Sequence, residues 1–417
     1  MADPATVAAP QLSFREVLQL RPVRSLWMAQ TVSIFGDFLA IFAVFAVVTF
    51  KLHGSAEQVT LILIAYLLPL AFVSPFAGVF IDKWNVRWTM IASDLVRAVL
   101  VLVLPFTRSL NGFYSVFFAL SVVSSFFAPA QSVAVRTITP TAGLLAANAL
   151  MSQAIQAMQI IGPAAAGILV DRFGANSCFL LDSASFLFSA AMVFSIAIDR
   201  QPAPAGLRAS SVWASMRQGI AFVFTHPAIS FVVISMTAGM FAVRCFGALL
   251  SVYVRDLLHS DASRFGLLNS LIGVGMIIAS PFVPRLGRKF SAKHLVAYGL
   301  MGVGVGVLIT AIFATVPTTA IAMLGLGLSF ACIVVPAQTL LQQETPHEML
   351  GRVSSSLMSL IAFVQVLALI IAAPVAHAVG IQRLYLGSAI LLFLIGGLGY
   401  GSLRKRTPEA ADVSSHV

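Results

Sequence analysis

Two charged residues stand inside long apolar runs of this sequence. Asp37 lies in the run 25–50 and Arg244 in the run 229–252. An unpaired ion at the centre of a membrane helix costs at least about 2.5 to 3.5 kcal/mol. The sequence therefore predicts that the two residues pair, and that Asp37 takes up a proton when the pair opens. The alternative is that Arg244 binds backbone carbonyls while Asp37 hydrogen-bonds Ser33.

A stripe of polar side chains follows one helix face in the run 146–170. Its members, at i, i+4, i+8 and i+11, are Asn148, Ser152, Gln156 and Gln159. Amides in lipid are costly unless they line a cavity or bridge helices, and we expect a cavity here. Bridging is the alternative. The other expected lining residues are Gln131 and Gln338, with Phe38 from a phenylalanine row whose alternative role is ordinary packing.

A charged loop follows the second apolar run, and its residues could act as a gate. Gly78 permits close approach of two helices, and Asp82 can pair with a base in one conformation and release it in another. The bases expected to take part are Lys83, Arg87 and Arg136. The alternative is that the bases only set membrane topology. Asn85 lies in the same loop, and asparagine can adopt a left-handed turn as glycine does.

Asp94 and Arg97 form an i, i+3 pair near the cytoplasmic end of the third run. Two interpretations stay open. The pair is either self-neutralised and structural, or part of the gate's charge cluster with Asp82 and Arg136. A further acid, Asp182, lies in the sixth run, where we expect a structural role.

The elements that position these residues are membrane helices. The chain has 417 residues, of which 59% are hydrophobic and 10% charged, and its mean hydropathy is +0.96. Runs of about 20 apolar residues are long enough to cross a bilayer as helices. Twelve are predicted, at 25–50, 59–81, 88–107, 112–134, 146–170, 175–198, 229–252, 264–283, 294–315, 317–340, 353–377 and 382–402.

The basic residues indicate the orientation. If the N-terminus is cytoplasmic, 18 of the 25 Lys and Arg residues lie at cytoplasmic ends and loops, so both termini are expected in the cytoplasm. The net charge of +10 is explained by this distribution, and no nucleic-acid partner is expected. The three cysteines are far apart within apolar runs, which indicates neither a disulfide framework nor a zinc site.

Short segments repeat at an offset of 206 or 207 residues, which indicates an internal duplication. Ser-Pro-Phe recurs at 74–76 and 280–282, and Pro-Ala-Gln at 129–131 and 336–338. Asp37 and Arg244 share this offset and so occupy equivalent positions. We expect an all-α membrane protein of two six-helix halves related by an axis along the membrane normal. Its parts are a tail 1–24, a half 25–198, a linker 199–228 with an amphipathic helix, a half 229–402 and a tail 403–417.

The loop Gly78–Arg87 resembles the signature of the major facilitator superfamily. The segments Ser33–Asp37, Ser93–Ala98, Leu181–Phe186 and Gly219–Pro227 resemble the branch with the enterobactin exporter and macrolide efflux pumps. The resemblance implies that the first and seventh helices line a central cavity. It further implies export of a bulky amphipathic small molecule, coupled to protons, across a bacterial inner membrane. We expect a monomer without cofactors.

Three other functions compete with export: a lipid flippase, a membrane enzyme and a channel. A lysophospholipid flippase is the nearest alternative, because the lysophospholipid transporter neighbours this branch. A membrane enzyme is disfavoured, since the sequence holds no phosphate-binding loop and no metalloprotease or nucleophile-elbow motif. A channel is disfavoured because nothing in the sequence resembles a selectivity filter.

Overall fold

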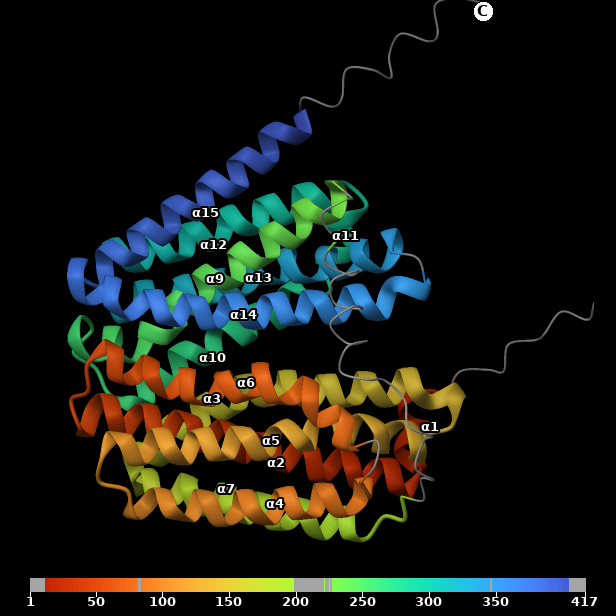
Figure 1. Ribbon diagram of the computed structural model, residues 1–417. Coiled ribbons are helices and arrows are strands. Elements are labelled where there is room, and N and C mark those ends of the chain that lie inside the picture. The colour runs from red at the N-terminus through yellow and green to blue at the C-terminus, as the bar shows by residue number, and fades with distance from the viewer. Residues whose placement is uncertain are drawn as a thin grey trace, which may run out of the picture. The chain divides into compact units, whose positions relative to one another are not determined.

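The computed structural model describes residues 12–81, 84–198, 227–345 and 347–404, together with residues 221 and 225. Within these ranges every regular element is a helix (Figure 1). The expected amphipathic linker helix, both chain ends and two gate residues, Asp82 and Lys83, lie outside the described residues.

Twelve helices of the described chain are long and apolar enough to cross a membrane, which confirms the predicted number. The first six are α2 Arg21–Ala46 continued by the π-helix η1 Val47–Lys51, α3 Ala56–Ile81, α4 Val86–Val103, α5 Leu110–Ile138, α6 Leu144–Phe173 and α7 Ala175–Phe194. The second six are α9 Pro227–Asp256, α10 Ala262–Ala279, α12 Ala292–Ile312, α13 Val316–Glu344, α14 His347–Val379 and α15 Ile381–Arg404. Short helices are α1 Phe14–Gln19, η2 Leu104–Phe106, η3 Thr141–Gly143 and α11 Val283–Gly287.

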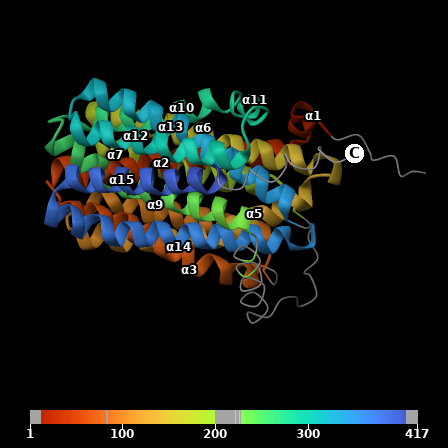
Figure 2. The same cartoon turned by 90° about the horizontal axis from the view of Figure 1, so that it is seen from above.

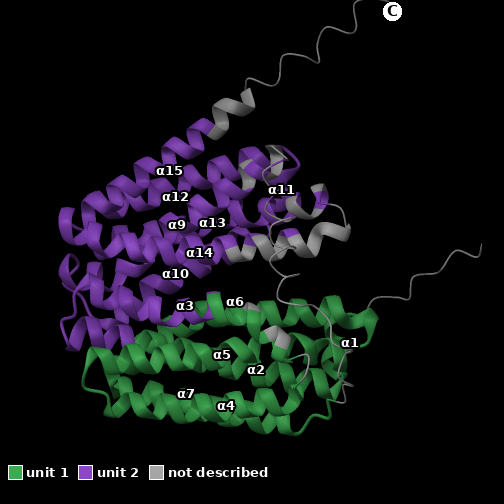
Figure 3. Cartoon of the chain, viewed as in Figure 1, with its two compact units in different colours: residues 1–43, 72–206 green, residues 44–71, 207–417 purple. Residues whose placement is uncertain are grey.

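The chain forms two compact units (Figure 3). Unit 1 comprises residues 1–43 and 72–206, and unit 2 comprises residues 44–71 and 207–417. The unit boundaries therefore fall inside α2 and α3. The hairpin 44–71, which the sequence places with the first half, belongs to unit 2, and the division into two six-helix halves stays a prediction.

Unit 1 begins with α1, inside the segment expected to be a tail. A capping box starts this helix, because Ser13 and Glu16 satisfy each other's backbone and side-chain groups. These hydrogen bonds from Ser13 hold the pKa of Glu16 below its ordinary value. The backbone hydrogen bond from the Leu12 N–H to the Ala142 carbonyl, at 3.0 Å, attaches this segment to η3, which directly precedes α6. Val17 of α1 is completely buried beside it.

Asn85 does not adopt the left-handed turn that asparagine can form. Its backbone is extended, with φ −72° and ψ 114°, and it is the N-cap of α4. The side-chain oxygen accepts a hydrogen bond from the Trp88 N–H at 3.1 Å. Asparagine is favoured here because it satisfies a helix-end donor, which a glycine would leave without a side-chain partner.

Unit 2 is built around α9, which packs beside α14 and α15 (Figure 2). Two buried tyrosines mark this contact. The Tyr385 hydroxyl donates to the Phe246 carbonyl at 3.1 Å, and the Tyr253 hydroxyl donates to the Thr310 carbonyl at 2.9 Å. Their ring centroids are 5.6 Å apart. Both polar tips are thus satisfied while the rings fill the apolar interior.

Helices α10 and α13 of unit 2 approach each other through glycine. A Cβ placed on Gly327 would lie 1.9 Å from the Ile272 carbonyl oxygen and 3.0 Å from the Cα of Gly275. No residue larger than glycine fits such a contact without separating the helices. Membrane helices, which gain little from hydrophobic association in lipid, commonly pack in this way.

Candidate functional site

A buried polar cluster occupies unit 1 where α4 packs against α7. Asp94 is completely buried and Arg97 is 3% exposed, and the two form an ion pair one turn apart on α4. From α7, the Ser189 hydroxyl donates to the second carboxylate oxygen of Asp94 at 2.7 Å. The Asp94 carboxylate is therefore compensated by a cation and by a hydroxyl, as a buried charge requires.

The guanidinium of Arg97 lies between two aromatic rings. Its central carbon is 4.4 Å from the ring centroid of Phe127 on α5 and 4.3 Å from that of Phe186 on α7. Arginine stacks on such faces because the ring quadrupole attracts the cation. The buried Nε of Arg97 has no hydrogen-bond partner in the described chain. Packing thus fixes the guanidinium, although its donors are not all used.

A third helix, α2, reaches the same cluster through Gly36 and Asp37. A Cβ placed on Gly36 would lie 2.4 Å from Asp182 Oδ1 and 2.2 Å from the Ser185 hydroxyl, both on α7. Asp182 is 1% exposed, whereas Asp37 is half-buried. The charges of Asp94 and Arg97 act on Asp37, and that of Asp37 acts on Asp182. Three acids and one base are therefore gathered inside unit 1.

Sequence reasoning gave Asp182 a structural role without connecting it to Asp37, Asp94 or Arg97, and the structure places it near them. A signal was present in the sequence, since Asp182, Ser185 and Ser189 stand at i, i+3 and i+7 and share one face of α7. The small residue before Asp37 was the second signal, because glycine in a membrane helix often marks a close neighbour.

The gate residues in the described part of the chain are spread over several helix ends. Gly78 lies in α3 near its C-terminal end, and Arg136 is exposed in the last turn of α5. Arg87, at the start of α4, donates to the Phe194 carbonyl at the end of α7. Its guanidinium carbon is 5.0 Å from the Phe194 ring centroid. A cation at a helix C-terminus complements the helix dipole.

The polar stripe of α6 is exposed at all four positions, Asn148, Ser152, Gln156 and Gln159. The opposite face, with Ala147, Leu150 and Ala154, is buried. Gln338 on α13 is also exposed, and the Gln131 amide on α5 lies 3.9 Å from the Met151 sulfur. Phe38 packs against Gly162 of α6, where a Cβ would lie 2.4 Å from the Cβ of Phe38.

Arg244 belongs to α9 in unit 2, whereas Asp37 belongs to unit 1. Its guanidinium is half-buried and donates to Oε1 of Gln365 on α14. The amide oxygen is a neutral acceptor, so this hydrogen bond does not compensate the positive charge of the guanidinium. The predicted pairing of Asp37 with Arg244 stays a prediction.

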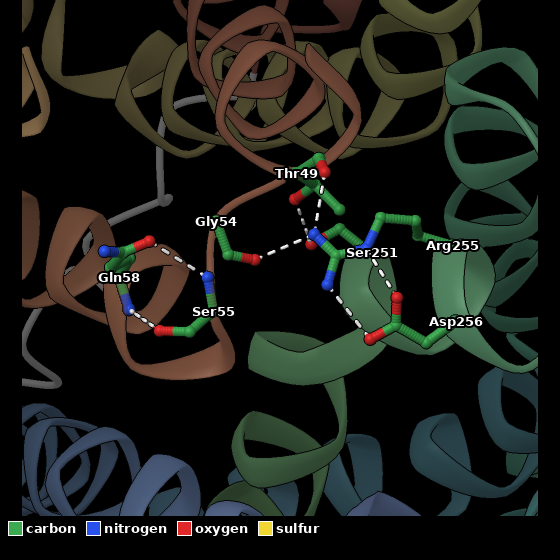
Figure 4. A network of polar contacts seen from close by, with 7 residues as sticks. All are labelled: Thr49, Gly54, Ser55, Gln58, Ser251, Arg255 and Asp256. Carbon is green, nitrogen blue, oxygen red and sulfur yellow. Dashed lines mark hydrogen bonds and ion pairs between the residues drawn. The ribbon is translucent and has the colours of Figure 1, made fainter. Parts of the chain in front are cut away.

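A second polar network, which sequence reasoning missed, joins the end of η1 to the end of α9 within unit 2 (Figure 4). One terminal nitrogen of Arg255 donates to the carbonyls of Thr49 and Gly54, each at 2.8 Å. Beside it, the buried hydroxyls of Thr49 and Ser251 are 3.0 Å apart. Asp256 pairs with the same guanidinium, with one contact at 2.9 Å.

The two helices joined by Arg255 end in the same backbone conformation. His53 and His259, 206 residues apart, have φ angles of 50° and 47°. The bond from the Gly54 N–H to the Val48 carbonyl is matched by the bond from the Ser260 N–H to the Val254 carbonyl. Non-glycine residues rarely adopt such φ angles. Their recurrence at the repeat offset supports the internal duplication independently of the sequence matches.

Among the described residues, no group of three or more His, Cys, Asp or Glu side chains could hold a metal ion. Twelve apolar helices in the described part of the chain, some with ionisable groups inside them, are the architecture of a multi-pass membrane protein. The chain belongs to the Major Facilitator Superfamily, whose sequence model matches residues 26–358 and, in a second match, residues 232–416.

Relatives include efflux proteins. Macrolide efflux protein A of Streptococcus pyogenes is 24% identical over 389 residues, covering 89% of this chain and 93% of that protein. The multidrug efflux pump Tap of Mycolicibacterium fortuitum is 22% identical over 356 residues, covering 82% and 87%. These proteins are similar to the chain over nearly their whole length.

Solved structures share the fold. The nucleoside transporter NupG superposes with a TM-score of 0.76 at 11% identity, covering 91% of this chain and 99% of that one. A bacterial homologue of the lysosomal transporter Spinster gives a TM-score of 0.70 at 11% identity, covering 92% and 96%. The predicted transporter fold of twelve membrane helices is thereby confirmed.

Proposed function

We propose that this protein is a secondary active exporter that moves a bulky amphipathic small molecule out of the cell by alternating access, driven by protons. Similarity to macrolide and multidrug efflux proteins over more than four fifths of the chain supports the substrate class. Asp37, an acid held half-buried among ionisable groups in a membrane helix, is the observation that carries proton coupling. Acids in such positions commonly belong to proton relays.

In this proposal Asp37 is the coupling acid, and Arg244 acts together with it from the equivalent position of the repeat. Arg244 already bonds a polar side chain, Gln365, and so it can exchange that partner for a substrate group or a carboxylate. The exposed stripe Ser152, Gln156 and Gln159 lines the substrate path, since water or substrate would satisfy its amides. Gln131, Gln338 and Phe38 complete the proposed lining.

Two gates operate in this proposal. The cytoplasmic gate consists of Gly78, Asp82, Lys83, Arg87 and Arg136, with Asp94 and Arg97 behind it. The opposite gate is the Arg255 network, because it ties the hairpin 44–71 to α9. Under the predicted duplication that hairpin belongs to the first half and α9 to the second. The contact must therefore break whenever the halves separate on the outer side.

The proposed setting is a bacterial plasma membrane, with both termini in the cytoplasm and the chain acting as a monomer. Everted membrane vesicles test the function directly. On acidification of their interior, vesicles with the protein should accumulate a macrolide or a cationic dye, and a protonophore should abolish the accumulation. Vesicles lacking the protein are the control. Flipping of lysophospholipid without accumulation of either compound would overturn the proposal.

A further inference from the structure

Helices α2 and α7 pack closely inside unit 1, where Gly36, the residue before Asp37, lies against Asp182. At Gly36 the backbone of α2 lies so close to α7 that an added Cβ would be 2.4 Å from Asp182 Oδ1. Asp37 is the next residue on α2, and its charge acts on Asp182. Asp182 is 1% exposed and Asp37 is half-buried. The pair therefore has a closed end at Asp182 and an accessible end at Asp37.

The positive charge nearest to this pair is already engaged. Arg97 acts on both Asp37 and Asp182, but its ion pair is with Asp94. Asp94 also accepts from Ser189, and Phe127 and Phe186 hold the guanidinium between them. Asp94 and Arg97 thus form a neutral unit. Asp37 and Asp182 are left as two acids without a cation of their own in the described part of unit 1.

The other groups around Asp182 do not supply a positive charge. The Ser185 hydroxyl donates to the Asp182 backbone carbonyl at 2.7 Å and lies 3.3 Å from its Oδ1. The thiol of Cys178, one turn away on α7, also interacts with Asp182 and is uncharged when protonated. A hydroxyl can orient a carboxyl group, but it cannot neutralise two of them.

We propose that Asp37 and Asp182 form a carboxyl pair that binds and shares one proton, with the Asp94–Arg97 pair as its neutral support. Two carboxylates that interact inside a helix bundle disfavour each other's ionised form, so the pair holds one proton more readily than either acid would alone. The proton enters and leaves through Asp37, the less buried member. This inference rests on the proposed proton coupling. It adds Asp182 as the residue whose negative charge favours binding of the proton to Asp37.

The first test removes the second acid without changing its shape. Asp182→Asn leaves Asp37 without its like-charged neighbour, so the coupling proton binds only at lower pH. The pH profile of uphill transport should shift to lower pH by about one unit or more, while downhill exchange of substrate is retained. The matched control is Asn176→Ala, a neutral change at an exposed position of the same helix, which should leave the profile in place. An unshifted profile in Asp182→Asn would overturn the proposal.

The second test needs no variant and covers the case in which Asp182→Asn does not fold. Infrared spectroscopy of the wild-type protein labelled with isotopic aspartate should show a protonated aspartic acid band at neutral pH that disappears on alkalinisation. Absence of the band would overturn the carboxyl pair. Failure of the proposed function would be visible separately. A wild-type transport rate that does not depend on pH would contradict proton coupling, while the infrared band could still be present.

Discussion

The glycine contact between α10 and α13 predicts opposite effects for two neighbouring substitutions. In Gly327→Ala the new methyl group would lie 1.9 Å from the Ile272 oxygen and 2.8 Å from the Ile272 carbonyl carbon. These are backbone atoms, so they cannot rotate away as a side chain could. Relief requires α10 and α13 to separate by more than about 1 Å, since ordinary carbon contacts begin near 3.5 Å.

The expected cost follows from overpacking. Inserted methyl groups in packed interiors destabilise by about 1 to 3 kcal/mol, whereas alanine gains about 1 kcal/mol over glycine in helix propensity. Gly325, two residues earlier, has nothing within 4 Å of its added Cβ. Gly325→Ala therefore keeps the propensity gain without the clash. The two variants should differ in stability by about 1 to 3 kcal/mol, with Gly327→Ala the less stable.

This difference is measured by thermal unfolding of both variants in the same detergent, with size-exclusion chromatography to monitor the loss of folded protein. Gly327→Ala should unfold at a lower temperature than the wild-type protein, and Gly325→Ala at the same or a higher temperature. Equal unfolding temperatures for the two variants would refute the close approach of α10 and α13.

Three further predictions concern transport. Asp82→Asn should abolish most transport while folded protein remains in the membrane, measured as vesicle uptake beside quantitative blotting, and normal uptake would exclude Asp82 from the gate. Arg255→Gln should increase labelling of a Thr49→Cys variant by an impermeant thiol reagent about tenfold, since two hydrogen bonds to a charged group are lost. The control Arg264→Gln should not increase it. Equal labelling of Thr49→Cys with and without Arg255→Gln would exclude a gate at Arg255. Cysteines at positions 152, 156 and 159 in a cysteine-free background should be labelled by aqueous thiol reagents and protected by substrate. A cysteine at the exposed apolar Ile161 of the same helix is the control and should not be labelled. Labelling of the stripe no better than at position 161 would place the stripe in lipid.

The twelve spans were predictable from the sequence because an uninterrupted apolar run has one stable form in lipid. Backbone groups there must bond within their own segment, which makes a helix. Helix ends were less certain, since they depend on caps such as Asn85. Its side chain bonds the Trp88 N–H rather than supporting a left-handed turn.

The buried cluster was only partly predictable. The i, i+3 spacing of Asp94 and Arg97 predicted their pairing. The approach of Asp182 to α2 depends on how each helix is rotated about its own axis, and almost uniformly apolar helices carry little sequence information about that rotation. The Arg255 network was missed for another reason. Its acceptors are the backbone carbonyls of Thr49 and Gly54, which no side-chain pattern reveals.

Proton-coupled export through Asp37 is tested most directly by transport in proteoliposomes containing Asp37→Asn. The account predicts that this variant no longer concentrates substrate against a gradient when a pH difference is imposed, yet still exchanges substrate downhill. Asp171→Asn, an exposed acid on α6, is the matched control and should concentrate substrate normally. Accumulation by Asp37→Asn at the wild-type rate would contradict the account.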